Sequence, residues 1–62
     1  MMIGQAVKEA RKKKGISQAT LAEKTGYSRT YLADLEGGRY TPGWEVVRKL
    51  AKELKINLNS LL

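Results

Sequence analysis

Basic and hydrogen-bonding side chains are the ones that could do chemistry in this sequence, because the residue types behind most catalytic and metal sites are missing. The 62 residues include no Cys and no His, which excludes zinc sites, disulfides, cysteine nucleophiles and an imidazole base. The 6 acidic residues are scattered singly among 12 Lys and Arg residues, and the formal net charge is +6. We therefore expect a binding module with no enzymatic activity, no metal and no cofactor.

A group of short and polar side chains recurs on one side of the segment that we expect to be a helix over about residues 29–36. At about 100° per residue, Leu32 and Leu35 set the inward direction. The opposite arc holds Thr30, Ala33, Asp34 and Gly37, flanked by Arg29 and Tyr31. Side chains of this size would let the helix backbone approach a ligand closely.

Helical periodicity predicts the elements that must position this arc, and the expected fold is all-α, a compact bundle of four to five short helices. Apolar residues recur at three- and four-residue spacing, which predicts helices over about residues 2–14, 18–25, 29–36 and 43–55. After them, Asn57 could cap a last short turn that holds Leu58, Leu61 and Leu62. A chain this short has room for one small core, so we expect residues 1–62 to form a single domain.

Capping residues mark the predicted helix boundaries. Ser17 and Ser28 can cap the second and third helices through their hydroxyl groups. Glycine at position 26 can adopt the left-handed conformation that ends a helix. Thr41 is expected to cap the fourth helix, with Pro42 at its first helical position, where the missing N–H costs nothing.

The helices predicted at 18–25 and 29–36, joined by a short turn with a glycine, have the arrangement of a helix-turn-helix. Ala22 falls where the two helices would cross, and Gly26 lets the chain reverse. Across "VKEARKKKGISQATLAEKTG", "YSRTYLADLEGGR" and "TPGWEVVRKLAKELKINLNSLL" the chain resembles regulators of the Cro and phage-lambda-repressor type, the xenobiotic-response-element family. The resemblance covers almost the whole chain. It implies sequence-specific binding of double-stranded DNA by a homodimeric transcriptional regulator, a repressor acting on an inverted-repeat operator.

The sequence departs from the family pattern at three positions. Gly37 stands where Asn is common, and we expect it to keep the left-handed turn that ends the third helix. Tyr27 replaces a smaller aliphatic residue, and Thr25 takes a position that is generally apolar. A side-chain contact made by the missing Asn is therefore not expected here.

The exposed arc of the helix at 29–36 fits the requirements of a recognition helix. A major groove about 12 Å wide admits a helix whose donors and acceptors contact base edges near its N-terminal end. We expect base contacts from Arg29 to guanine, from Thr30 to a base or phosphate, and from Ala33 to a thymine methyl group. Asp34 is costly near phosphates unless it accepts a hydrogen bond, for example from a cytosine amino group, so it disfavours indiscriminate binding.

Contacts to the DNA backbone are expected around this helix. The resemblance implies a phosphate contact by Gln18, which its amide and the nearby helix N-terminus can support. The other backbone contacts that we expect come from Ser28, Tyr31, Arg39, Tyr40 and Thr41. The resemblance also pairs Arg11 with Glu36, and because both lie at the edge of an apolar stripe, we expect this ion pair to be structural.

Several basic and aromatic residues have a second interpretation that the sequence leaves open. The lysine run at 12–14 could contact phosphates, but charge at a helix C-terminus also suits solvent and the helix dipole. Tyr31 and Tyr40 could equally cover the edge of the core with their rings. Trp44 lies on the apolar stripe of the fourth helix, where the family has Leu, and we expect it in the core.

Two other classes of function remain as alternatives. An antitoxin-type or other protein-interaction module would use the same fold, and co-purification of a stoichiometric partner would favour it. A basic amphipathic peptide at a membrane surface is suggested by the first helix, and vesicle binding by residues 1–15 would support it. The dimer surface is left open, because the last leucines could cover the core or join two protomers.

The expected surroundings of the chain follow from what it lacks. No apolar run approaches the roughly 20 residues that span a bilayer, and the absence of Cys suits the cytoplasm. The N-terminal stretch carries no secretion signal, because its charge follows the apolar residues. We therefore expect a cytoplasmic protein with no membrane contact, and no small-molecule effector, since a domain this small has no evident pocket.

Overall fold

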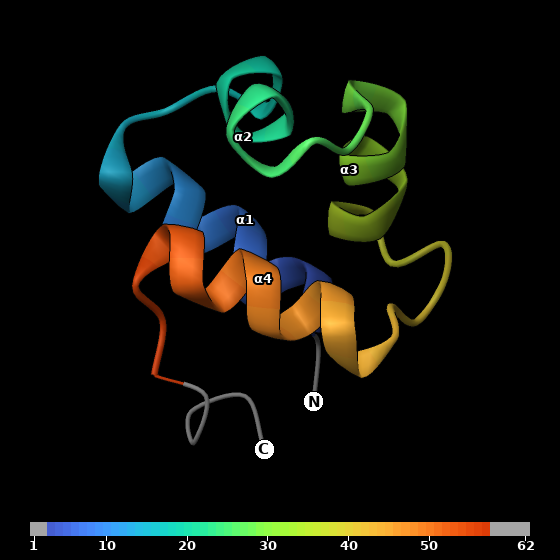
Figure 1. Ribbon diagram of the computed structural model, residues 1–62. Coiled ribbons are helices and arrows are strands. Elements are labelled where there is room, and N and C mark those ends of the chain that lie inside the picture. The colour runs from blue at the N-terminus through green and yellow to red at the C-terminus, as the bar shows by residue number, and fades with distance from the viewer. Residues whose placement is uncertain (1–2, 58–62) are drawn as a thin grey trace.

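Four helices and no strand are present in residues 3–57, the part of the chain that this computed structural model describes (Figure 1). They are α1 (Ile3–Lys14), α2 (Gln18–Thr25), α3 (Arg29–Glu36) and α4 (Trp44–Leu54). The all-α fold class is thus confirmed, and α2 and α3 span the ranges expected from the sequence. The predicted last turn with Leu58, Leu61 and Leu62 lies outside the described residues.

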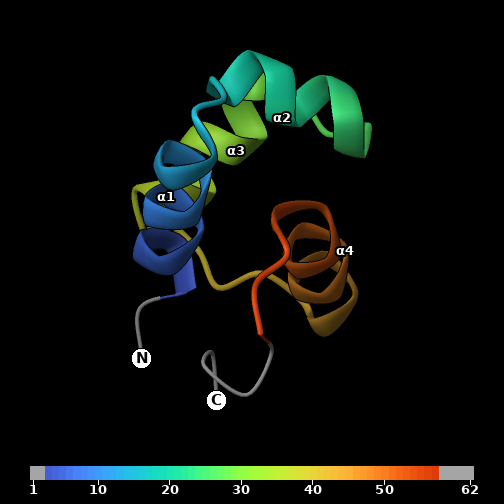
Figure 2. The ribbon, with the colours of Figure 1, turned by 90° about the vertical axis from the view of Figure 1, so that its left-hand side faces the viewer.

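The helices form two packed pairs around one core. α1 packs against α3 and α4, and α2 packs against α3 and α4, so every helix contacts at least two others. Figure 1 shows α2 and α3 above the α1–α4 pair, and Figure 2 shows α4 facing α1 and α3 across the molecule. The largest fully buried side chains come from all four helices: Val7, Leu21, Leu32, Leu35 and Leu50. The two from α3, Leu32 and Leu35, are three residues apart and lie on one face of the helix, so the opposite face of α3 is turned to solvent.

The two serine caps are confirmed. The Ser17 hydroxyl accepts a hydrogen bond from the backbone N–H of Thr20 at 3.0 Å, and the Ser28 hydroxyl accepts one from that of Tyr31 at 2.9 Å. Between the helices, Gly26 has φ +83° and its N–H donates to the Ala22 carbonyl, which ends α2. Local sequence therefore sets where α2 ends and α3 begins.

The predicted cap of α4 is wrong, although the helix begins within one residue of the expected position 43. α4 begins at Trp44, and its N-cap is Gly43 in an extended conformation with no side-chain capping bond. Thr41 and Pro42 belong to the segment that joins α3 to α4, where Pro42 lies near Gly4 at the beginning of α1. The chain needs these residues to cross from one helix to the next, so the helix starts later than its proline suggests.

Trp44 is not a core residue, contrary to the prediction. It is 50% exposed and is the one large hydrophobic residue that is exposed within residues 3–57. α4 packs on the core through Val47, Leu50, Ala51 and Leu54. Trp44 precedes Val47 by nearly one turn, at the very start of the helix, so the periodicity continues past the point where the other helices cover α4.

Thr25 shows how a polar residue occupies a position that is generally apolar in the family. It is 2% exposed, and its hydroxyl donates to the Leu21 carbonyl at 2.8 Å. This bond satisfies the buried hydroxyl without a partner from another helix. The substitution therefore leaves the packing of α2 intact.

A buried ion pair joins the ends of three helices. The Arg11 side chain, at the end of α1, donates from Nε to Glu36 Oε2 at 2.8 Å and from Nη2 to Glu36 Oε1 at 3.1 Å. Its Nη1 donates to the Ile16 carbonyl at 2.9 Å, and Gln18 Nε2 donates to Glu36 Oε1 at 3.0 Å. The resemblance paired the two charged residues, and the structure adds Gln18 and Ile16. This network ties α1, the start of α2 and the end of α3 together.

We predict that breaking the ion pair on one side destabilises the fold strongly. Glu36→Leu leaves the Arg11 guanidinium buried without its counter-charge, and such changes cost about 3 to 5 kcal/mol. Replacing both partners, with Arg11→Met and Glu36→Leu together, removes the uncompensated charge and should recover at least half of that loss. Urea denaturation measures both free energies of unfolding.

The exposed pair of Asp34 and Arg39 supplies the control for this experiment. Arg39 is 79% exposed, so Arg39→Ala should cost no more than about 1 kcal/mol. If Glu36→Leu proved as mild as Arg39→Ala, the buried pair would not hold the helices together.

Candidate nucleic-acid interface

The exposed side of α3 carries the side chains that the sequence assigned to a ligand. Arg29, Thr30 and Ala33 are exposed and Asp34 is half-buried, while Leu32 and Leu35 on the other side have no exposed surface. The arc therefore faces solvent along the length of the helix. Its members offer one cation, one hydroxyl, one methyl group and one carboxylate, which is a mixed set suited to contacting different base edges.

The N-terminal ends of α2 and α3 offer further donors. Gln18 is half-buried because its Nε2 is held by Glu36, but an amide nitrogen has two N–H groups, so the second is not used by this bond. Ser28 is exposed, and its hydroxyl oxygen caps α3 by accepting a hydrogen bond from the Tyr31 N–H, which leaves its own O–H without a role in the cap. Its O–H can still donate to an anion near the positive end of the α3 dipole. Both residues are thus fixed in position by bonds that leave a donor available.

The turn after α3 differs from the expected one. Gly37 has a right-handed conformation with φ −79°, and the left-handed residue is Gly38 with φ +77°. The prediction for Gly37 was therefore wrong by one position. The reason is that Gly37 continues the helical hydrogen bonds, with its N–H donating to the Ala33 carbonyl at 3.0 Å. The chain reverses at Gly38 and brings the exposed Arg39 back beside α3.

Tyr31 and Tyr40 form an aromatic cluster with Tyr27 at the side of α3. The Tyr27 and Tyr31 ring centroids are 5.2 Å apart, and those of Tyr31 and Tyr40 are 5.1 Å apart at a steep angle. The Tyr40 hydroxyl donates to the Tyr31 carbonyl at 3.1 Å, which fastens the segment after α3 to the helix. The sequence left two interpretations open for Tyr31 and Tyr40, and their half-buried rings fit the cover of the core edge.

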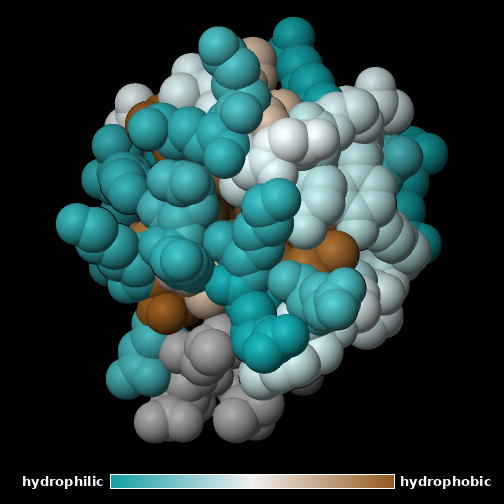
Figure 3. Space-filling view, in the orientation of Figure 1, coloured by the Kyte–Doolittle hydropathy of each residue, from teal (hydrophilic) through white to brown (hydrophobic). Residues whose placement is uncertain are grey.

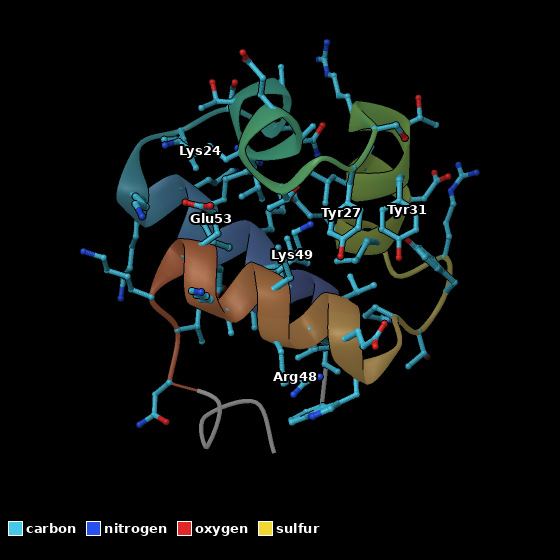
Figure 4. All side chains as sticks on the ribbon, in the orientation of Figure 1. Lys24, Tyr27, Tyr31, Arg48, Lys49 and Glu53 are labelled. Carbon is cyan, nitrogen blue, oxygen red and sulfur yellow. The ribbon has the colours of Figure 1, made fainter. Side chains whose placement is uncertain are left out.

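Tyr27 and Lys49 are partners that the sequence did not reveal. Lys49 Nζ lies 5.0 Å from the centre of the Tyr27 ring, a cation–π contact from α4 that Figure 4 shows. Burial raises the pKa of the Tyr27 and Tyr40 hydroxyls above the ordinary tyrosine value. The spacing of Tyr27 and Tyr31 by four residues was the available signal, but it does not point to α4.

The lysine and arginine residues are spread over other faces as well. Lys12, Lys13 and Lys14 at the end of α1 are exposed, and Lys14 Nζ donates to the Glu53 carbonyl at 2.7 Å. Figure 3 shows hydrophilic side chains gathered over α4 and the end of α1, with less polar ones over the α3 side. Exposed cations therefore lie on α1 and α4 as well as near α3, and the α3 side differs from them by its mixed, less hydrophilic side chains.

The segments around α3 bring most of the expected contact residues to one region. Ser28 precedes Arg29 and Thr30, and the turn after Gly38 returns Arg39 to within ion-pair distance of Asp34, at 3.6 Å. Gln18 Nε2 donates to the side chain of Glu36, the last residue of α3.

Among the described residues 3–57, the structure has no helix whose length and apolar character would suit a membrane span.

Comparisons with known proteins agree with this geometry. Residues 4–62 match the family model described as a helix-turn-helix domain. The immunity repressor protein of Bacillus phage phi105 is 39% identical over 62 residues, which is 100% of this chain and 43% of that protein. The ImmF control region 10 kDa protein of the same phage is 39% identical over 59 residues, or 95% of this chain and 66% of that protein.

A cellular protein is similar to the same degree. The HTH-type transcriptional regulator SinR of Bacillus subtilis (strain 168) is 39% identical over 62 residues, which is 98% of this chain and 56% of SinR. The chain thus spans 43 to 66% of the length of these three relatives. None of the solved structures compared with the chain matches it. On the family match and these relatives, the chain belongs to the helix-turn-helix domain family, in the lambda-repressor-like class that its sequence resembles.

Proposed function

We propose that this domain binds double-stranded DNA in a sequence-specific way and acts in the cytoplasm as a transcriptional repressor. It would occupy its operator and block access to it, without catalysis. The observation that carries the proposal is the exposed arc of Arg29, Thr30 and Ala33 on a helix fixed by a serine cap and a buried ion pair. The names of the phage immunity repressor and of SinR support it.

Affinity and specificity would come from different residues. The net charge of +6 attracts the phosphate backbone regardless of sequence, and the logarithm of the binding constant should fall with log salt by about 0.9 per phosphate neutralised. Contacts to base edges from α3 would supply the choice of sequence. Gln18, Ser28, Tyr31, Arg39, Tyr40 and Thr41 are our proposed backbone contacts. They would set the register of α3 in the groove.

The proposed contacts of Tyr31 and Tyr40 with the DNA backbone are mostly indirect. The single O–H of Tyr40 already donates to the Tyr31 carbonyl, so in this arrangement it is not available to donate to a phosphate. Tyr31 and Tyr40 would therefore act on DNA mainly by holding Arg39 and Thr41 beside α3.

A homodimer is part of the proposal because one recognition helix covers only a few base pairs. Two copies related by a two-fold axis place their α3 helices in successive major grooves, about one helical turn apart. An inverted repeat in the DNA matches that symmetry.

The test is the selection of bound duplexes from a random-sequence pool by the purified chain at near-physiological salt. We expect enrichment of an inverted repeat whose half-site centres are about 10 base pairs apart. A pool that stays random, from a chain shown by circular dichroism to be folded and helical, would contradict sequence-specific binding by this domain.

We predict that Arg29→Ala relaxes the preference at one base pair of each half-site. A lost bidentate contact to guanine should cost about 1 to 3 kcal/mol on the selected duplex and much less on a random one. Equilibrium binding to both duplexes measures the difference. Arg48→Ala on the exposed face of α4 removes the same charge away from α3 and is the matched control. Equal losses on both duplexes for Arg29→Ala would mean that this residue contacts only the backbone.

A further inference from the structure

Asp34 and Arg39 are joined twice across the turn that follows α3. The Arg39 backbone N–H donates to the Asp34 carbonyl at 3.0 Å, and Arg39 Nε lies 3.6 Å from Asp34 Oδ1. Four residues separate them, and the last two, Gly37 and Gly38, allow the close return. The Asp34 side chain is 42% exposed and that of Arg39 is 79% exposed, so the pair sits at the surface with its ends accessible.

The geometry of this pair determines which donors of Arg39 are available. A guanidinium group has five N–H donors in a rigid plane, and here the Nε edge is the one that faces a carboxylate. Because the Arg39 side chain is 79% exposed, N–H groups of its fork that do not face Asp34 stay accessible to a ligand. Two parallel N–H groups at the end of an arginine match the O6 and N7 acceptors of guanine in the major groove.

The position of Asp34 on α3 places the ion pair on the exposed arc. Asp34 follows Thr30 by four residues, so both lie on the same exposed arc of α3. Its attachment draws Arg39 toward that arc. A carboxylate there is unfavourable near phosphates unless it is compensated, and the Arg39 cation supplies the compensation.

We propose that Arg39 contacts a guanine in the major groove and that Asp34 is its positioning residue. The inference rests on the proposed function and narrows it. It replaces the expected phosphate contact of Arg39 by a base contact, and the expected cytosine contact of Asp34 by a role that acts through Arg39. The recognition surface then extends from the N-terminal half of α3 to the turn after its C-terminal end.

The test combines two conservative variants with duplexes that differ at one base pair. Arg39→Lys keeps the positive charge but loses the planar fork, so binding to random duplex should stay within about twofold. The ratio of the affinities of Arg39→Lys for the selected duplex and for a duplex changed at one guanine of the half-site should fall by about tenfold or more. Replacing that guanine by 7-deazaguanine, which lacks the N7 acceptor, should weaken the unmodified chain and leave Arg39→Lys almost unaffected.

Asp34→Asn separates positioning from simple charge repulsion. Removing the negative charge should strengthen binding to random duplex, as electrostatics alone requires. If Asp34 positions Arg39, discrimination at the same guanine should fall at the same time. If Asp34 only repels phosphates, affinity for both duplexes should rise equally and discrimination should not change.

Arg48→Lys on α4 should alter neither affinity nor discrimination, and thermal unfolding shows that each variant is folded. Unchanged discrimination in Arg39→Lys, with a selected site in hand, would overturn the base contact and leave the proposed function standing. A folded chain that selects no sequence would contradict the proposed function, and the base contact would fall with it.

Discussion

The buried ion pair between Arg11 and Glu36 is the interaction on which the rest of the structure depends. Its two short bonds, with those to Gln18 and the Ile16 carbonyl, join the end of α1, the start of α2 and the last residue of α3. The apolar core alone could accept small rotations of α3, because leucine contacts are not directional. Hydrogen-bonded charges demand a particular geometry. The network therefore fixes the orientation in which α3 is presented.

Presentation and recognition are divided between the two sides of α3. Leu32 and Leu35 hold the inner side, the tyrosine cluster covers an edge, and Ser28 caps the start, so the outer side is free to vary in sequence without changing the fold. Positive charge, by contrast, is distributed over α1 and α4 as well. A domain of this kind can approach any duplex through its charge and select one sequence through a small set of side chains.

Most of the helix boundaries were predictable from neighbouring residues, whereas the exact turn after α3, the cap of α4 and most contacts between helices were not; the Arg11–Glu36 pair was expected only from the family resemblance. The serine caps and the glycine between α2 and α3 act within a few residues, so these boundaries followed from local patterns. Trp44 continues the apolar period of α4, and its exposure depends on where the other helices end. Gly4 is similar: a Cβ there would collide with the Leu35 carbonyl, a closeness of α1 and α3 that no local pattern reveals. In the candidate site, the exposed arc followed from helical period, whereas the contact of Asp34 with Arg39 depends on a turn at Gly38 in place of Gly37.

The most direct test of the account is to map which backbone amides of the isotopically labelled chain shift in NMR spectra when a selected duplex is added. We expect the largest changes at the start of α2, along the exposed side of α3 and in residues 37–41. The amides of the outer side of α4, around Arg48 and Lys52, should change little. Largest changes on α4, with α3 unaffected, would contradict the central claim that α3 is the surface that meets DNA.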